Sequence, residues 1–290
     1  MTTARPLADL LEPSRVIGYH DGIALTAIPG AEDVQAAREV WERIYDFNLA
    51  ELTAEREDFW ATKLDDHMAE IERWHRFTAD DVYVEIGCGP SYIGEYLMSR
   101  YDVGFIGIDF NLGILDALRR YLDAKGFTKY LLVHADIHQM PLRDGVADYL
   151  YGGGVIEHFT DTVSLLRECR RVLRPGGVAF NTVPACNLSW PGRLTSNIPA
   201  VPPFRQAFEA LHLGLLGGRV LQRHAGYELS FTRGQLVDLH LRAGFARAEA
   251  GPLPFHASPA RLPSALLRQL YWAISTFGPT SPAYYAAATA

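Results

Sequence analysis

Hydrophobic positions follow two different patterns on either side of residue 81. Before it, apolar side chains recur at helical spacing in residues 31–48 and again in residues 60–74. Such spacing places apolar groups on one face of a helix and predicts two helices. We therefore expect residues 1–80 to form an N-terminal helical segment.

After residue 81, short apolar runs alternate with stretches of helical period. Alternation of this kind indicates β-α-β units and a parallel sheet. The expected fold is α/β, a Rossmann-like, doubly wound, mostly parallel sheet with helices on both faces. The predicted strands are VYVEI (82–86), VGFIGID (103–109), KYLLVHAD (129–136), ADYLYGG (147–153) and GVAFNTV (177–183).

The alternation stops after the fifth predicted strand. Residues 184–231 are rich in Pro, Gly and aromatic side chains and are too long for an ordinary loop, so we interpret them as a substrate cap insertion. Residues 81–183 and 232–290 then form the main domain. In the second part, Thr232 and Gln235 predict a capped helix, residues 246–251 a sixth strand and residues 263–275 a helix. The final AYYAAATA resembles a frayed tail, and no seventh strand is placed.

Composition narrows the class of protein. The chain has 290 residues, a formal net charge of −7 and a pI near 5.8, which argues against a nucleic-acid substrate. Its three cysteines show no paired spacing, which indicates a reducing compartment. We see neither a signal peptide nor an apolar run of about 18 residues that could cross a membrane. A cytoplasmic protein without a transmembrane segment is expected, and a homodimer is left open.

The segment VYVEIGCGPSYIGEYL (82–97) suggests a ligand site. An apolar strand ends near Glu85 and is followed by Gly87 and Gly89, just before a predicted helix. In doubly wound sheets ligands bind beyond the carboxyl ends of the strands, and a helix N-terminus favours an anionic group. A tight turn without a ligand would give the same short motif.

Two more acids end the next two strands. Asp109 lies about 20 residues beyond the glycines, where a carboxylate can accept both hydroxyls of a ribose. Asp136 could accept from an exocyclic amine while Ile137 packs on a purine, and Gly153 lies where the fourth strand would pass under a ligand. Each acid alone is equally compatible with a surface residue or a helix cap.

Together, VEIGCG, GIDFN, HADIHQMPL, ADYLYGGGVIEHFTD, LRECRRVLRPGGVAFNTVP and LVDLHLRAGF resemble the class I S-adenosylmethionine-dependent methyltransferases, over roughly residues 81–251. The resemblance implies S-adenosylmethionine as cofactor and a seven-stranded sheet with one antiparallel strand. It implies a loop under the cofactor, a contact to the ribose and a contact to the adenine. The candidate cofactor-binding residues are Glu85, Gly87, Cys88, Gly89, Asp109, Phe110, Asp136, Ile137 and Gly153.

Two features test this resemblance. The family often has a third glycine where this chain has Ser91, which could donate to the methionine carboxylate or cap the helix. A nicotinamide dinucleotide is the rival cofactor, but its G-x-G-x-x-G pattern would require glycine at the position of Tyr92.

Candidate chemistry follows the fourth predicted strand. His158 is the candidate catalytic base, because an imidazole titrates near neutrality; a structural histidine is the alternative. Glu157 could orient that ring or, more simply, cap the next helix. His134 and His138 frame Asp136 at a spacing that suggests metal, but they straddle a strand end, so we expect no metal site.

The expected function is methyl transfer to a small, apolar or aromatic acceptor, most simply at a hydroxyl, in secondary or lipid metabolism. Aromatic side chains of the insertion and the N-terminal helices favour such an acceptor. An N- or C-methyltransferase of the same fold, or a non-catalytic protein that binds the cofactor or another ligand, remains the alternative.

Overall fold

The computed structural model describes residues 6–28, 41, 64–193, 195–221, 226–253, 270, 273 and 277–290. The predicted helix over 31–48 lies outside the described residues except for position 41, and most of the predicted helix over 263–275 also lies outside them. The described part of the second N-terminal stretch is helical, as α3 (Leu64–Trp74).

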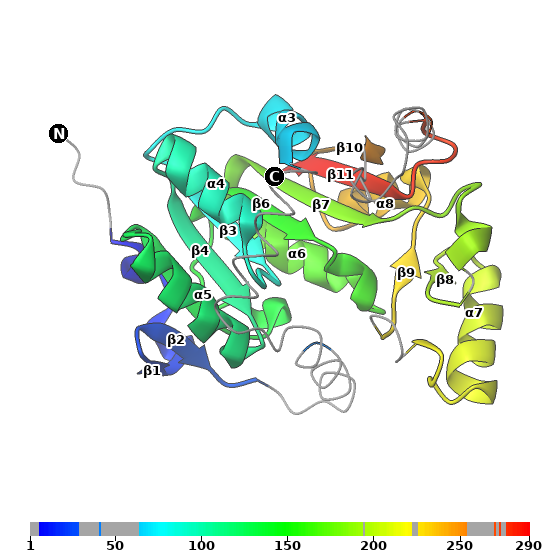
Figure 1. Ribbon diagram of the computed structural model, residues 1–290, viewed down its shortest axis with the longest axis horizontal. Coiled ribbons are helices and arrows are strands. Elements are labelled where there is room, and N and C mark those ends of the chain that lie inside the picture. The colour runs from blue at the N-terminus through cyan, green and yellow to red at the C-terminus, as the bar shows by residue number, and fades with distance from the viewer. Residues whose placement is uncertain are drawn as a thin grey trace.

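A sheet of nine strands within the described residues forms the centre of the molecule (Figure 1), in the order β1-β2-β5-β4-β3-β6-β7-β11-β10. Its strands are β1 (Val16–His20), β2 (Ile23–Thr26), β3 (Val82–Ile86), β4 (Gly104–Asp109), β5 (Tyr130–His134), β6 (Ala147–Gly153), β7 (Leu173–Pro184), β10 (Arg247–Leu253) and β11 (Ala283–Thr289). The five predicted strands are thus confirmed. From β5 to β10 the sheet has seven strands, of which β11 alone runs antiparallel to its neighbours, as the resemblance implied.

Helices cover both faces of the sheet, because strand residues alternate between two cores. On β3, Tyr83 faces the core under the helices α3, α4 and α5, whereas Val84 and Ile86 face the core under α6 and α8 (Figure 1). The remaining helices of this frame are α4 (Tyr92–Tyr101), α5 (Leu112–Ala124), α6 (Thr162–Val172) and α8 (Arg233–Arg242). The capping box of Thr232 and Gln235 is present at the start of α8.

The description of residues 1–80 as helical is wrong for their first part. After the short 3-10 turns η1 (Leu7–Leu10) and η2 (Pro13–Arg15), strands β1 and β2 form an antiparallel hairpin. Strand β2 adds to the edge of the main sheet by pairing parallel with β5, with Ala24 opposite Val133. Its side chains are mostly buried, so this edge belongs to the core.

The prediction of a frayed tail is also wrong. The last residues form β11, which lies between β7 and β10 and is buried on both faces. It is the seventh strand that the sequence did not reveal. The sixth strand, predicted over 246–251, is confirmed as β10.

Residues 184–231 leave the sheet after β7 and return before α8. They contain a small parallel pair of strands, and Ala185 forms a bridge to Phe231, so the segment begins and ends side by side. Its elements are η5 (Trp190–Arg193), β8 (Ile198–Pro199), α7 (Phe204–Glu209), the π-helical turn η6 (Ala210–Leu215) and β9 (Leu229–Ser230). Among the helices of the described residues, none is long and apolar enough to cross a membrane.

Candidate active site

The loop after β3 is built on two glycines with left-handed backbone. Gly87 has φ +54° and Gly89 has φ +45°, a region that side chains rarely allow. A Cβ on Gly87 would also lie 2.8 Å from Val155 Cγ2, on the loop after β6. The glycines therefore let two strand-end loops approach closely at the switch point of the sheet.

Ser91 binds the Glu85 carboxylate instead of capping α4. It precedes α4 but makes no side-chain cap; its hydroxyl donates to Glu85 Oε2 at 2.7 Å. The Tyr83 hydroxyl donates to the same oxygen at 3.1 Å. These two bonds fix the buried Glu85 carboxylate beneath the loop, where a third glycine could not do so.

Asp109 links the second strand end to the loop. Its Oδ2 accepts the amide of Gly89 at 2.9 Å, and its Oδ1 accepts the amide of Asn111, also at 2.9 Å. Burial raises the pKa of Asp109, and the backbone hydrogen bonds oppose that rise. An ionised carboxylate has about four acceptor sites, so Asp109 keeps capacity for further donors such as ribose hydroxyls.

Cys88 takes part through its backbone. Its amide donates to the carbonyl of Ile108 at 3.0 Å, which ties the loop to β4. Its side chain is buried, and burial raises the pKa of the thiol far above its usual range. The residue therefore positions the loop rather than acting as a nucleophile.

The third strand end carries Asp136 and Ile137. Asp136 caps the 3-10 turn η3 (Ile137–Gln139): its Oδ1 accepts the amide of His138 at 2.9 Å and lies 3.1 Å from Nδ1 of the same residue. The side-chain hydrogen bond from His138 lowers the pKa of Asp136, so it is ionised at neutral pH. Ile137 is buried in the core beneath it.

The histidines around Asp136 have separate partners. His134 Nε2 lies 2.9 Å from the backbone oxygen of Phe110, and because a carbonyl only accepts, that nitrogen donates. This bond joins the third strand end to the second. Within the described residues, no group of three metal-ligating side chains comes together.

The end of β6 leaves no room for side chains. A Cβ on Gly152 would meet Asn181 Oδ1 at 2.6 Å, and one on Gly153 would collide with the Tyr151 side chain. The Tyr151 hydroxyl in turn lies 2.8 Å from Nε2 of His67 on α3. This pair was not predicted from the sequence, because its two residues are far apart in the chain and leave no local pattern.

His158, on the 3-10 turn η4 (Ile156–His158), has a defined tautomer. Its Nδ1 lies 2.8 Å from the carbonyl oxygen of Tyr227, so Nδ1 carries the proton and Nε2 is the basic atom. Burial lowers the pKa of His158 to about 4, below the value of about 6.5 expected from the sequence. The ring also meets Trp41 edge-on, with centroids 5.0 Å apart.

The interpretation of Glu157 as a helix cap is wrong. Asp161 is the residue that caps α6, by accepting the amide of Ser164. Glu157 is instead buried at 3% exposure, and its Oε2 has no hydrogen-bond partner among the described residues. Burial raises the pKa of this carboxyl far above its usual range, which keeps a protonatable group beside His158.

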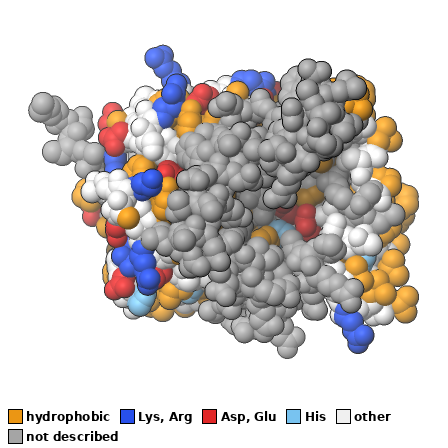
Figure 2. Space-filling view, in the orientation of Figure 1, with side chains coloured by type: hydrophobic (Ala, Val, Ile, Leu, Met, Phe, Trp, Pro, Cys, Tyr) orange, Lys and Arg blue, Asp and Glu red, His pale blue; other side chains and the backbone are white. Residues whose placement is uncertain are grey.

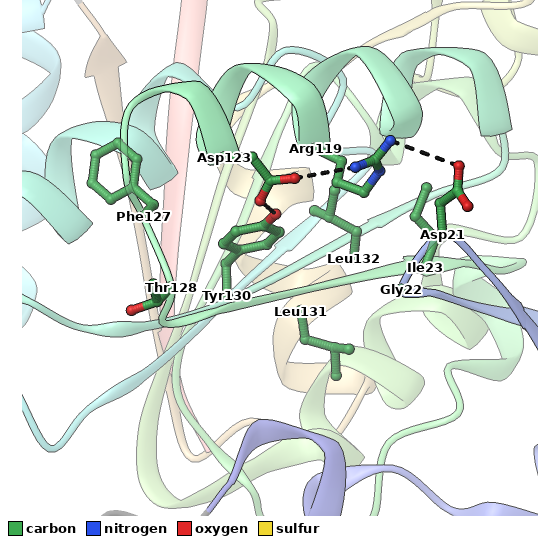
Figure 3. A pocket seen from close by; sticks show the side chains of 10 residues that line it. All are labelled: Asp21, Gly22, Ile23, Arg119, Asp123, Phe127, Thr128, Tyr130, Leu131 and Leu132. Atoms are coloured by element: carbon green, nitrogen blue, oxygen red, sulfur yellow. Dashed lines mark hydrogen bonds and ion pairs between the residues drawn. The ribbon is translucent and has the colours of Figure 1, made fainter.

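A cavity of about 400 Å³ lies elsewhere, between the β1–β2 turn, α5 and the start of β5 (Figure 3). Arg119 and Asp123 form an ion pair at its wall, 3.1 Å apart. It opens at the amino end of β5, opposite the strand ends that carry the candidate site. We therefore assign it no part in the chemistry.

Comparison with known proteins supports the class that the sequence motifs resemble. Residues 84–181 match the family described as a methyltransferase domain. The chain is 32% identical over 181 residues to a Mycolicibacterium smegmatis protein named "Probable S-adenosylmethionine-dependent methyltransferase", covering 61% of this chain and 65% of that protein. It is 24% identical over 166 residues to the demethylmenaquinone methyltransferase of Geobacillus stearothermophilus, covering 54% of this chain and 66% of that protein.

The fold agrees with a solved methyltransferase. The structure of Haemonchus contortus phosphoethanolamine N-methyltransferase 2, with phosphomonomethylethanolamine and S-adenosylhomocysteine, superimposes with a TM-score of 0.60 at 13% identity, covering 87% of this chain and 59% of that one. These likenesses support a class I S-adenosylmethionine-dependent methyltransferase domain in this chain. It spans just under two thirds of the length of the two curated relatives described above.

Proposed function

We propose that this chain transfers the methyl group of S-adenosylmethionine to a hydroxyl of a small, apolar or aromatic acceptor, in secondary or lipid metabolism. The observation that carries the proposal is the edge formed by β3 and β4, where the Asp109 carboxylate holds the amide of Gly89 at 2.9 Å. That bond fixes the glycine loop and an acceptor of hydrogen bonds side by side, beyond the carboxyl ends of the strands.

Each strand end then has a role in holding the cofactor. Asp109 accepts the ribose hydroxyls, Asp136 accepts the adenine amine, and Ile137 with Phe110 packs against the base. Glu85 and Gly153 border the methionine part, and the backbone of residues 87–89 lies beneath it. When bound, S-adenosylmethionine supplies a methyl group on a sulfonium centre that a nucleophile attacks in line.

The charge of these loops supports the choice of cofactor. Residues 85–91, 109–112, 134–140 and 153–160 contain four acidic residues and no lysine or arginine, although burial raises the pKa of one of the four, Glu157, far above its usual range. A sulfonium cation is favoured next to carboxylates, whereas the pyrophosphate of a nicotinamide dinucleotide would be repelled by them.

The neutral Nε2 of His158 is our candidate for taking the proton of the acceptor hydroxyl. With a pKa of about 4 it is a weak base, so an acidic hydroxyl such as a phenol suits it better than an aliphatic alcohol. Aromatic contacts around the site support an apolar acceptor: Trp41 lies against His158, and Trp190 meets Phe208 at 5.2 Å within the insertion 184–231. We propose that this insertion caps the acceptor.

We propose that the protein acts on a small molecule in the cytoplasm. A net charge of −7 favours a small molecule over a nucleic acid as substrate. Within the described residues, Cys88, Cys169 and Cys186 form no disulfide bond, which fits the reducing cytoplasm.

Calorimetry tests the cofactor assignment. S-adenosylhomocysteine should bind the wild-type protein, NAD should not, and Asp109→Asn should weaken binding by about 1–3 kcal/mol because buried donors lose a charged acceptor. Asp116→Asn, an acid on α5 that pairs with Arg119, is the matched control and should bind normally. Binding of NAD in place of S-adenosylhomocysteine would refute the assignment.

Incubation with methyl-labelled cofactor and a metabolite extract tests the reaction. We expect a methylated product whose label sits on oxygen. A product labelled on nitrogen or carbon would correct the acceptor atom, and tight cofactor binding without any product would favour a non-catalytic binding protein.

A further inference from the structure

The outer side of the insertion 184–231 exposes large hydrophobic side chains. Of the ten exposed large hydrophobic residues in the described part of the chain, five belong to this segment. Figure 2 shows hydrophobic side chains along the edge of the molecule where Figure 1 places α7. The five are Leu188, Phe204, Leu211, Leu213 and Leu215. Exposed apolar side chains gathered in one segment mark a surface that meets another apolar phase.

Four of these five side chains lie on one short helix, formed by α7 and η6 and here termed the leucine-rich helix (residues 204–215). Its inner side is anchored: His212 is only 3% exposed, and Phe208 packs between His212 and Trp190. Its outer side carries Leu215 at 80% exposure and Leu213 at 47%. The helix is therefore amphipathic, with its apolar outer side held in place by the contacts of its inner side.

Charge distinguishes this segment from the rest of the protein. Residues 184–231 contain four arginines, two glutamates, and neither lysine nor aspartate, although the whole chain has a net charge of −7. Arg219, four residues after the end of the leucine-rich helix, is exposed, and no ion pair within the described residues involves it. Arg205, within the helix, pairs with Glu209 at 2.9 Å. The apolar surface thus lies in the basic part of an acidic protein.

We propose that the leucine-rich helix docks on an anionic lipid bilayer, with its leucines in the headgroup region and Arg219 against lipid phosphates. Basic amphipathic helices bind such surfaces through buried apolar area and electrostatic attraction together. The rest of the chain carries a net negative charge, so an anionic surface favours contact with the basic segment. A symmetric second copy fits less well, because it would bring the two basic segments against each other. The proposal does not depend on the identity of the methyl acceptor.

Vesicle co-sedimentation tests the proposal. The full chain should bind vesicles of phosphatidylcholine with phosphatidylglycerol more tightly than vesicles of phosphatidylcholine alone, and added salt should weaken the difference. The double variant Leu213→Ser with Leu215→Ser should lower the partition coefficient at least tenfold. The matched control is Leu241→Ser on α8, because Leu241 has the same 47% exposure as Leu213 but lies outside the insertion. It should bind as the wild type does.

Two arginine variants test the electrostatic contribution to vesicle binding. Arg219→Gln should weaken binding to anionic vesicles about fivefold and leave binding to neutral vesicles unchanged. Arg242→Gln, an exposed arginine on α8, should have little effect. Equal binding of the double leucine variant and the wild type would overturn the proposal. So would a concentration-dependent dimer in analytical ultracentrifugation that the leucine variant abolishes, in a protein that does not bind vesicles; that result would assign the surface to a second copy.

Discussion

The loops after β3 and β6 are in contact, but the ionisable side chains at the two loops differ in their hydrogen bonding. Beside the loop after β3, at the ends of β3 and β4, Glu85 and Asp109 accept hydrogen bonds from hydroxyls and backbone amides at 2.7–3.1 Å. In the loop after β6, Glu157 is buried with an oxygen that has no partner among the described residues, and burial lowers the pKa of His158 to about 4. Two neighbouring loops thus differ in how far their polar groups are satisfied.

This difference suggests that one loop binds the cofactor and the other takes part in the reaction. A carboxylate that accepts several hydrogen bonds is held in a fixed position, which suits the recognition of ribose and amine groups. A buried group with a shifted pKa can change its protonation when a ligand arrives, and such groups gather at reactive sites. We therefore expect variants of the first loop to affect stability and cofactor binding, and variants of the second to affect turnover and pH dependence.

The largest effect is expected for Gly87→Ala. The alanine would adopt a left-handed backbone and place a Cβ 2.8 Å from Val155 Cγ2, so both strain and overlap destabilise the fold, by about 3 kcal/mol. Gly126→Ala is the matched control, because Gly126 has φ +81° but open space around it. It should cost about 1–2 kcal/mol from backbone strain alone. Denaturant unfolding measures both, and equal losses would show that the contact between the loops is unimportant.

His158→Gln should lower kcat by about 100-fold while cofactor affinity hardly changes, because the proposed general base is lost. Since burial lowers the pKa of His158 to about 4, its neutral form predominates from pH 6 to 8, and the wild-type rate should not titrate near 6.5. The measurement is kcat across pH, with affinity from calorimetry.

The control for this variant is His240→Gln. His240 is also buried, its Nδ1 lies 2.7 Å from the Leu236 carbonyl oxygen, and burial lowers its pKa to about 4 as well. It lies on α8, outside the proposed site, so its substitution should lower stability and leave kcat unchanged. If both variants lose stability and neither loses kcat specifically, His158 has a structural role.

The sequence predicts the parts of the fold whose signals are local. Strand β3 alternates between two cores and ends beside an acid, and the same pattern recurs at Asp109, so these residues are found without a structure. The hairpin β1–β2 also had a local signal: Asp21 and Gly22, both with positive φ, join two short apolar runs, and Asp-Gly is typical of tight hairpin turns. It was missed because its first strand is largely exposed.

Strand β11 had no such signal. Alanine is uncommon in strands, and an alanine-rich terminus resembles a disordered tail. In the fold, Ala286, Ala287 and Ala288 are buried between β7 and β10, where the neighbouring strands supply the hydrogen bonds and small side chains fit under the packed helices. The roles of Ser91 and Glu157 likewise depend on tertiary neighbours. Ser91 reaches Glu85, and burial under the insertion sets the state of Glu157.

The smallest expected effect, and the most specific to the loop after β6, belongs to Glu157→Gln. Burial raises the folded-state pKa of Glu157, so the native protein retains a proton that the unfolded chain releases as the pH rises above the ordinary glutamate value of 4.5. Where the native state binds more protons, stability falls as pH rises, and this loss continues until the pH passes the raised pKa. Glutamine has no such cost. The variant should therefore unfold like the wild type near pH 4 and become relatively more stable toward pH 8, by about 1 kcal/mol.

The same substitution at Glu249, where the hydrogen bond from Arg73 lowers the pKa, reverses the sign: the wild-type carboxylate stabilises the fold above its ordinary pKa, and that stabilisation is lost only as the pH falls through the lowered value. Thermal unfolding from pH 4.5 to 8 for Glu157→Gln, and from pH 4.5 downward for the Glu249 variant, measures the two slopes. Parallel slopes for wild type and Glu157→Gln would mean that the carboxyl is satisfied in solution, and the contrast between the two loops would then rest on His158 alone.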